Sequence, residues 1–184
     1  MRILGICGSL RKASYNRRLL VAAQGLVPAG VTIEIAELRD IPIFDQDVQE
    51  AGDPPAVAAL KGRVRDSEGL LLATPEYNWG VPGPLKNTID WLSRPPRESP
   101  LVRKPVALMG ATTGPWGTVR AQLALRQILL FPQMQVLPSP WVHVTMAKDK
   151  FASDGALTDE QTKQQIRDLL AAFERWIAQV TPPV

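Results

Sequence analysis

The fold expected of this chain is decided by the stretch Ile3-Leu4-Gly5-Ile6-Cys7-Gly8-Ser9-Leu10-Arg11-Lys12-Ala13-Ser14-Tyr15-Asn16. Residues 2–7 form a short apolar run that stops at a turn, as buried parallel strands do. Residues 15–27 then change to helical spacing, with apolar side chains on one face. The loop between them, residues 8–16, precedes a helix N-terminus, where free N–H groups and the helix dipole favour negative charge. This loop is therefore a candidate anion site.

The composition of this loop narrows the kind of anion. It matches neither the Walker A pattern nor the Gly-x-Gly-x-x-Gly pattern of dinucleotide sites. Ser9 and Ser14 offer hydroxyl donors, Asn16 an amide, and Arg11 a cationic fork. A loop rich in hydroxyls with a single glycine suits a terminal monophosphate. The alternative for its basic residues is a solvated helix start that binds nothing.

Strand-like and helix-like segments alternate along the rest of the chain. We expect further strands at residues 31–35, 69–74, 105–110 and 133–136. We expect helices from 54 to about 66, around 85–92, at 117–131, and at 158–180 with Thr158 as N-cap. Residues 38–47 are too rich in Asp and Pro for a regular element. This order implies one α/β domain, residues 1–184, with a parallel sheet covered by helices on both faces.

In such sheets ligands bind outside the carboxyl ends of the strands. Residues 8–16, 75–83 and 111–118 therefore belong to one expected site, as its first, second and third loops. The second loop holds Tyr77 and Trp79 between prolines and glycines, which suits a flat heteroaromatic ring. The alternative is a proline-braced loop whose two aromatics cover the sheet edge. The third loop would form the opposite wall.

Composition and charge exclude several classes of protein. The 184 residues carry a net charge of +3, with 45% hydrophobic and 21% charged residues, as in ordinary globular proteins. The basic excess gathers in Arg11, Lys12, Arg17 and Arg18 instead of forming a long stripe, so nucleic acid is not an expected partner. The single cysteine, Cys7, excludes an internal disulfide and a cysteine-based metal cluster.

Metal, membrane and export signals are also missing from the sequence. His143 is the one histidine and has no second histidine with which to share a metal. No apolar run approaches the roughly 18 residues of a membrane span. Arg2 leads directly into a strand-like run, which is unlike a signal peptide. We therefore expect a cytoplasmic protein with no resident metal and no membrane partner.

Three motifs together resemble the NAD(P)H-dependent FMN reductase family, which includes quinone, chromate and azo-dye reductases. They are Gly8-Ser9-Leu10-Arg11-x-x-Ser14-x-Asn16, Pro75-Glu76-Tyr77-Asn78 and Leu85-Lys86-Asn87-x-Ile89-Asp90-Trp91. The resemblance implies the flavodoxin-like fold, a three-layer α/β/α arrangement around a five-stranded parallel sheet of order 2-1-3-4-5. It also implies a homodimer or homotetramer.

The resemblance further implies which residues bind FMN. The phosphate would be held by Ser9, Arg11, Ser14, Tyr15 and Asn16. The isoalloxazine ring would be lined by Pro75, Glu76, Tyr77 and Asn78, with Thr113, Gly114 and Gly117 on the third loop. One departure from the family pattern is Gly117-Thr118, preceded by Trp116, where the family has two adjacent glycines. The bulk added by Trp116 and Thr118 is expected to affect how open the cleft is.

The implied activity is hydride transfer from NADPH or NADH through FMN to a small acceptor such as a quinone, flavin, chromate or azo compound. Because the cofactor supplies the chemistry, we predict no catalytic residue. Glu76 is expected to brace the second loop instead of acting as a general acid. Two alternatives remain, namely a flavodoxin-type electron carrier and a nucleotide-phosphate-binding regulatory domain without redox activity.

Overall fold

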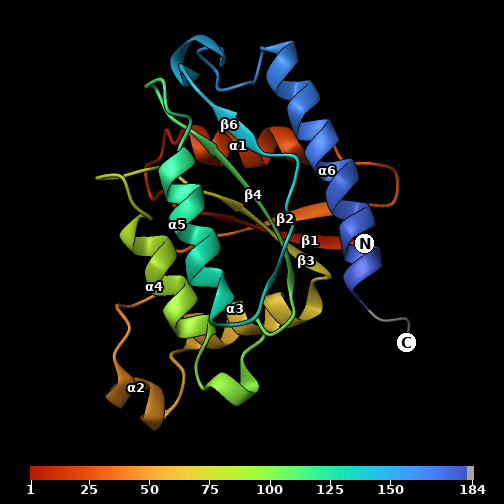
Figure 1. Cartoon of the computed structure of the whole chain (residues 1–184). Helices are drawn as coiled ribbons and strands as arrows, with labels where there is room; N and C mark the ends of the chain where they lie inside the picture. Colours follow the sequence, from red (N-terminus) through yellow and green to blue (C-terminus); the bar gives the residue numbers. More distant parts are fainter. Residues whose placement is uncertain (182–184) are drawn as a thin grey trace.

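A single parallel sheet forms the centre of the molecule (Figure 1). The computed structural model describes residues 1–181. Its strands are β1 (Arg2–Cys7), β2 (Thr32–Ala36), β3 (Gly69–Ala73), β4 (Pro105–Ala111), β5 (Gln135–Val136) and β6 (Val142–Val144). Their order is β2-β1-β3-β4-β5, all pairs are parallel, and β6 also pairs with β4. The predicted α/β class and strand order are confirmed.

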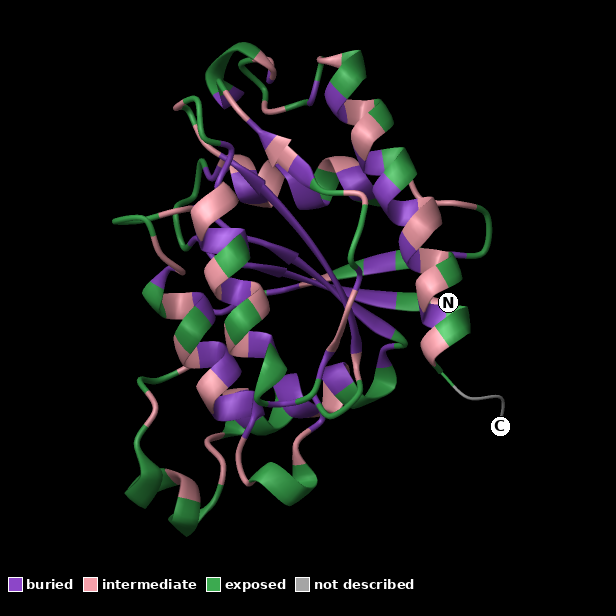
Figure 2. Ribbon diagram, viewed as in Figure 1, coloured by how far each residue is buried: buried purple, intermediate pink, exposed green. Residues whose placement is uncertain are grey.

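Helices cover both faces of this sheet. The α-helices of the described residues are α1 (Tyr15–Gln24), α2 (Gln46–Ala51), α3 (Pro55–Asp66), α4 (Gly83–Leu92), α5 (Val119–Leu130) and α6 (Glu160–Val180). Helices α1 and α6 pack on one face, and α3, α4 and α5 pack on the other. The central strands β1, β3 and β4 are almost entirely buried (Figure 2), which explains why they appear in the sequence as continuous apolar runs.

The fifth position of the sheet differs from the prediction. We expected one strand at residues 133–136, but two short strands share this edge. Strand β5 pairs with the start of β4 at Pro105 and Val106, and β6 pairs with its end at residues 109–111. The segment between them contains Pro138 and Pro140, which cannot donate to a sheet ladder. The interrupted edge follows from these prolines.

Two helix starts also correct the sequence analysis. Helix α2 begins inside the stretch predicted to be irregular, and the Asp45 carboxylate caps it by accepting from the Asp47 N–H at 2.9 Å. Helix α6 is capped by Asp159, which accepts from the Thr162 N–H at 2.9 Å, and not by Thr158. The Thr158 hydroxyl donates instead to the Lys150 carbonyl.

The expectation that residues 1–184 form one domain stays a prediction. The last residues of that expected domain, 182–184, lie outside the described part of the chain.

Candidate functional site

The three loops meet at the carboxyl ends of neighbouring strands, on one side of the molecule (Figure 1). They line a pocket of about 130 Å³. Its lining residues are Ser9, Arg11, Ser14, Tyr15, Asn16, Pro75, Glu76, Tyr77, Ala111, Thr112 and Thr113. The structure thus brings most predicted residues together, whereas Asn78, Gly114 and Gly117 lie outside this lining.

The first loop presents unused donors to the pocket. Ser14 is the N-cap of α1, and its hydroxyl oxygen accepts from the Arg17 N–H at 3.3 Å. The Ser9 hydroxyl oxygen accepts from the Arg11 N–H at 3.4 Å. Within the described residues, the Ser9 hydroxyl hydrogen and the N–H groups of Tyr15 and Asn16 remain available, and the Ser14 hydroxyl, which lies 3.8 Å from the Cys7 Sγ, also lines the pocket. Within residues 1–181, the exposed Arg11 guanidinium forms no ion pair. This donor set fits a phosphate group.

Cys7 lies beneath this loop and remains a neutral group there. Its Sγ is 3.5 Å from the Ser9 carbonyl oxygen and 3.8 Å from the Ser14 Oγ. Burial raises the pKa of the Cys7 thiol, and the hydrogen bonds to Ser9 and Ser14 oppose that shift only in part. A protonated thiol adds no negative charge below an anion site.

Asn16 joins the first loop to the end of β4. Its side chain is only 3% exposed. The Asn16 Nδ2 donates to the Ala111 carbonyl at 3.0 Å, and Oδ1 accepts from the Ala111 N–H at 2.8 Å. Most of the amide is therefore engaged by the backbone, and one N–H remains for a ligand. The side chain fixes the distance between two walls of the pocket.

Glu76 joins the second loop to the third. Its carboxylate is 10% exposed and accepts from the Arg120 N–H at 2.9 Å, the Ala121 N–H at 3.1 Å and the Arg120 Nη1 at 3.1 Å. These N–H groups belong to the first turn of α5, whose own N-cap, Thr118, makes no side-chain capping bond. A carboxylate is stabilised at a helix N-terminus. This geometry is that of a brace, as the sequence analysis expected.

The second loop ends in a tight two-residue turn. Tyr77 and Gly80 exchange two backbone hydrogen bonds, with N···O distances of 3.2 and 2.9 Å. The central residues Asn78 and Trp79 have φ values of +50° and +63°, as a type I′ turn requires. Asn tolerates this conformation well, whereas a Trp rarely adopts it. Asn78 therefore shapes the turn, and its exposed side chain does not line the pocket.

Thr118 and Trp116, the bulky residues by which the third loop departs from the family pattern, both lie outside the lining of the phosphate pocket. Thr118 is fully buried against β4, where a Cβ at Gly110 would lie 1.9 Å from the Thr118 Oγ1. Gly117 has φ of +55°, and a Cβ there would come within 2.8 Å of His143. Glycine is therefore required at both positions. Trp116, in contrast, is 59% exposed and does not line the pocket.

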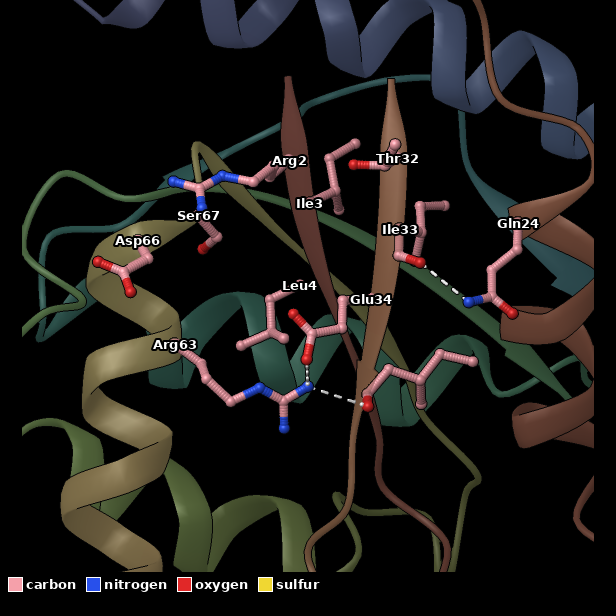
Figure 3. Close-up of a pocket in the computed structure, with 11 residues that line it drawn as sticks. Arg2, Ile3, Leu4, Gln24, Thr32, Ile33, Glu34, Arg63, Asp66 and Ser67 are labelled. Atoms are coloured by element: carbon pink, nitrogen blue, oxygen red, sulfur yellow. Dashed lines mark hydrogen bonds and ion pairs between the residues drawn. The ribbon is translucent and has the colours of Figure 1, made fainter. Parts of the chain in front are cut away.

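A second pocket lies at the opposite end of the sheet (Figure 3). It opens between the starts of β1 and β2 and the C-terminal end of α3. Its polar groups largely pair with one another, since the Arg63 Nη2 donates to Glu34 at 2.6 Å and to the Ile35 carbonyl at 3.1 Å. It also lies at the amino ends of the strands, away from the loops that bind ligands in such sheets.

Sequence reasoning missed the partners that hold the site together. Ala111 and Thr112 were predicted only as part of the third loop, and Arg120 only as a residue of the helix that follows it. No local pattern marks these contacts, because Asn16 and Ala111 are 95 residues apart and Glu76 and Arg120 are 44 residues apart. Over residues 1–181, no helix has the length and apolarity to cross a bilayer, and no cluster of three or more acidic, His or Cys side chains is arranged for a metal.

The fold, together with a set of hydrogen-bond donors suited to a phosphate group, is that of a flavodoxin-like protein with a mononucleotide site. The family model described as NADPH-dependent FMN reductase matches residues 1–149. An NAD(P)H-dependent FMN reductase of Pseudomonas aeruginosa is 45% identical over 96% of this chain and 95% of its own length. A quinone reductase of Escherichia coli is 37% identical over 98% and 97%. This chain belongs to the NADPH-dependent FMN reductase family, as the motifs predicted.

A solved structure agrees with this assignment. The flavoenzyme NAD(P)H:(acceptor) oxidoreductase FerB from Paracoccus denitrificans superimposes with a TM-score of 0.89 at 32% identity, covering 97% of each chain. The prediction that the chain is an oxidoreductase of the FMN reductase type is confirmed by these relationships.

Proposed function

We propose that this protein oxidises NADPH or NADH through FMN held at the three loops, and passes the electrons to a small acceptor such as a quinone. FMN supplies the hydride and electron chemistry when it is bound, and the protein binds, orients and shields it. The observation that carries the proposal is the unused donor set around Ser9, Arg11 and Ser14 in a chain of this family.

The proposed contacts with the phosphate come from the first loop. Ser9 and Ser14 donate hydroxyl hydrogens, Arg11 donates from its guanidinium, and Tyr15 and Asn16 donate backbone N–H groups from the first turn of α1. Asn16 also acts as a positioning residue through Ala111. Charge-assisted hydrogen bonds to a dianion are the strongest contacts that this loop can make.

The proposed contacts with the isoalloxazine ring are made largely by backbone. Pro75, Glu76, Tyr77 and Asn78 present the second loop to one edge, and the Glu76 carboxylate is occupied by α5. Thr113, Gly114 and Gly117 supply the facing wall. No side chain here is assigned as a catalytic acid, base or nucleophile.

The size of the pocket supports a role for a second copy of the chain. The pocket measures about 130 Å³, whereas pockets for drug-sized ligands span about 300–1,000 Å³. The phosphate end would occupy this pocket, and the ring would lie against the exposed Tyr77. A homodimer or homotetramer that covers this surface would complete the site, which sedimentation at working concentration can test.

The experiment that tests the function is anaerobic mixing of FMN-loaded protein with NADPH in a stopped-flow instrument. The proposal predicts that the flavin absorbance bleaches and that a quinone added afterwards restores it. A flavodoxin-type carrier would take up FMN without being bleached by NADPH. A colourless protein that does not take up FMN would contradict both the reductase and the electron carrier, and would favour a regulatory phosphate-binding domain.

A further inference from the structure

Three side chains form a stack between the second and third loops. The Arg120 guanidinium carbon lies 4.5 Å from the ring centroid of Trp79 and 4.5 Å from that of Trp116. Trp79 belongs to the tight turn of the second loop, and Trp116 belongs to the third loop. The cation therefore lies between two aromatic faces that come from opposite walls of the candidate site.

Core packing does not explain this stack. Trp79 is 73% exposed and Trp116 is 59% exposed, although large aromatic side chains are usually well buried. Trp79 also adopts a left-handed backbone conformation that a bulky residue rarely takes. Two exposed aromatics beside a pocket, one of them held in an unfavourable backbone conformation, indicate a role in recognition.

The stack is anchored to the pocket itself. The Arg120 Nη1 donates to Glu76 at 3.1 Å, and Glu76 lines the pocket. Tyr77 and Thr113, which also line it, lie two and three residues before the two tryptophans. The contact thus joins the tips of the two loops that wall the open side of the site.

We propose that Trp79, Arg120 and Trp116 form a latch that selects electron acceptors by size. Flat single-ring quinones pass between the latch and the position proposed for the isoalloxazine ring, whereas quinones with bulky substituents are excluded. This inference rests on the proposed function, and it assigns specificity to residues outside the lining of the phosphate pocket. The latch also retards the release of FMN, because it ties together the loops on either side of the ring.

The test compares Trp79→Ala, Trp116→Ala and the double variant with the parent protein. Trp141→Ala is the matched control, because Trp141 packs on Arg126 at 4.4 Å in a similar cation–π contact that does not join the two loops. For a bulky quinone we expect kcat/KM to rise about tenfold in the double variant, which corresponds to about 1.4 kcal/mol. For a single-ring quinone we expect little change. Trp116→Phe should keep the selectivity of the parent.

A second measurement does not depend on turnover. Release of FMN from each diluted variant is followed by the rise in free flavin fluorescence, and the double variant should release it faster than Trp141→Ala does. An unchanged preference between bulky and small quinones, or an equal change in Trp141→Ala, overturns the latch. If NADPH fails to bleach the flavin, the proposed function fails, whereas unchanged FMN release in the double variant overturns the latch separately.

Discussion

Removing the Glu76 carboxylate should destabilise the protein even when no cofactor is present. This carboxylate accepts three hydrogen bonds from the start of α5 and from Arg120, at 2.9 to 3.1 Å, and is 10% exposed. Hydrogen bonds to a charged group contribute about 1.5–3 kcal/mol, and loss of a helix cap costs about 0.5–2 kcal/mol. Because these contributions overlap, we expect Glu76→Ala to lower the free energy of unfolding by about 3 kcal/mol.

The assay is urea denaturation of the apoprotein, so that lost FMN binding cannot contribute. By thermal unfolding the same change corresponds to about 6–12 °C for a chain of this size. Glu76→Gln keeps one acceptor oxygen and should lose about half as much. The control is Glu37→Ala, which removes an exposed ion pair with Arg17, and such pairs contribute about 0–1 kcal/mol. Equal losses in Glu76→Ala and Glu37→Ala would refute the role of Glu76 as a brace.

Three further predictions concern the first loop and strand β6. Asn16→Ala leaves the Ala111 N–H and carbonyl without their side-chain partner, so urea denaturation of the apoprotein should show a loss of about 2–4 kcal/mol. Arg11→Gln should weaken FMN binding about tenfold by fluorescence titration, whereas Lys12→Gln should change it little, because Lys12 does not line the pocket. Burial first, and Arg126 second, lower the pKa of His143, so the stability that it contributes is complete above about pH 6.5 and is lost as the pH falls from there toward the folded-state pKa. His143→Gln should flatten that part of the stability profile, and an unchanged slope would contradict this assignment.

The layers could be predicted because they follow from local patterns, whereas the strand order was implied by the resemblance of three motifs to a known family. Each buried strand is a continuous apolar run, and each long helix carries one apolar stripe. The edge of the sheet could not be predicted in this way. Strands β5 and β6 are two and three residues long, so their existence depends on pairing with β4 and not on their own sequence. Helix α2 is similarly short, and its start depends on the Asp45 cap.

The candidate site, too, could be predicted only where neighbouring residues of the sequence determine it. Its loops could be located because each follows a strand, and Ser9, Arg11 and Ser14 lie within six consecutive residues of one loop. The contacts of Asn16 with Ala111 and of Glu76 with Arg120 connect distant parts of the chain. They depend on strand order and on loop conformation, which no single segment encodes. The stack of Trp79 on Arg120 was missed for the same reason.

The central claim is that the first loop holds the phosphate of FMN, and one comparison of ligands tests it most directly. The apoprotein is titrated with FMN and with riboflavin, which has the same ring and no phosphate, and binding is followed by the quenching of flavin fluorescence. We expect FMN to bind about a hundredfold more tightly, which is about 2.7 kcal/mol and within the range of about 1.5–3 kcal/mol for one charge-assisted hydrogen bond. Arg11→Gln should narrow that difference while leaving riboflavin binding unchanged. Equal affinity for the two flavins would contradict the account.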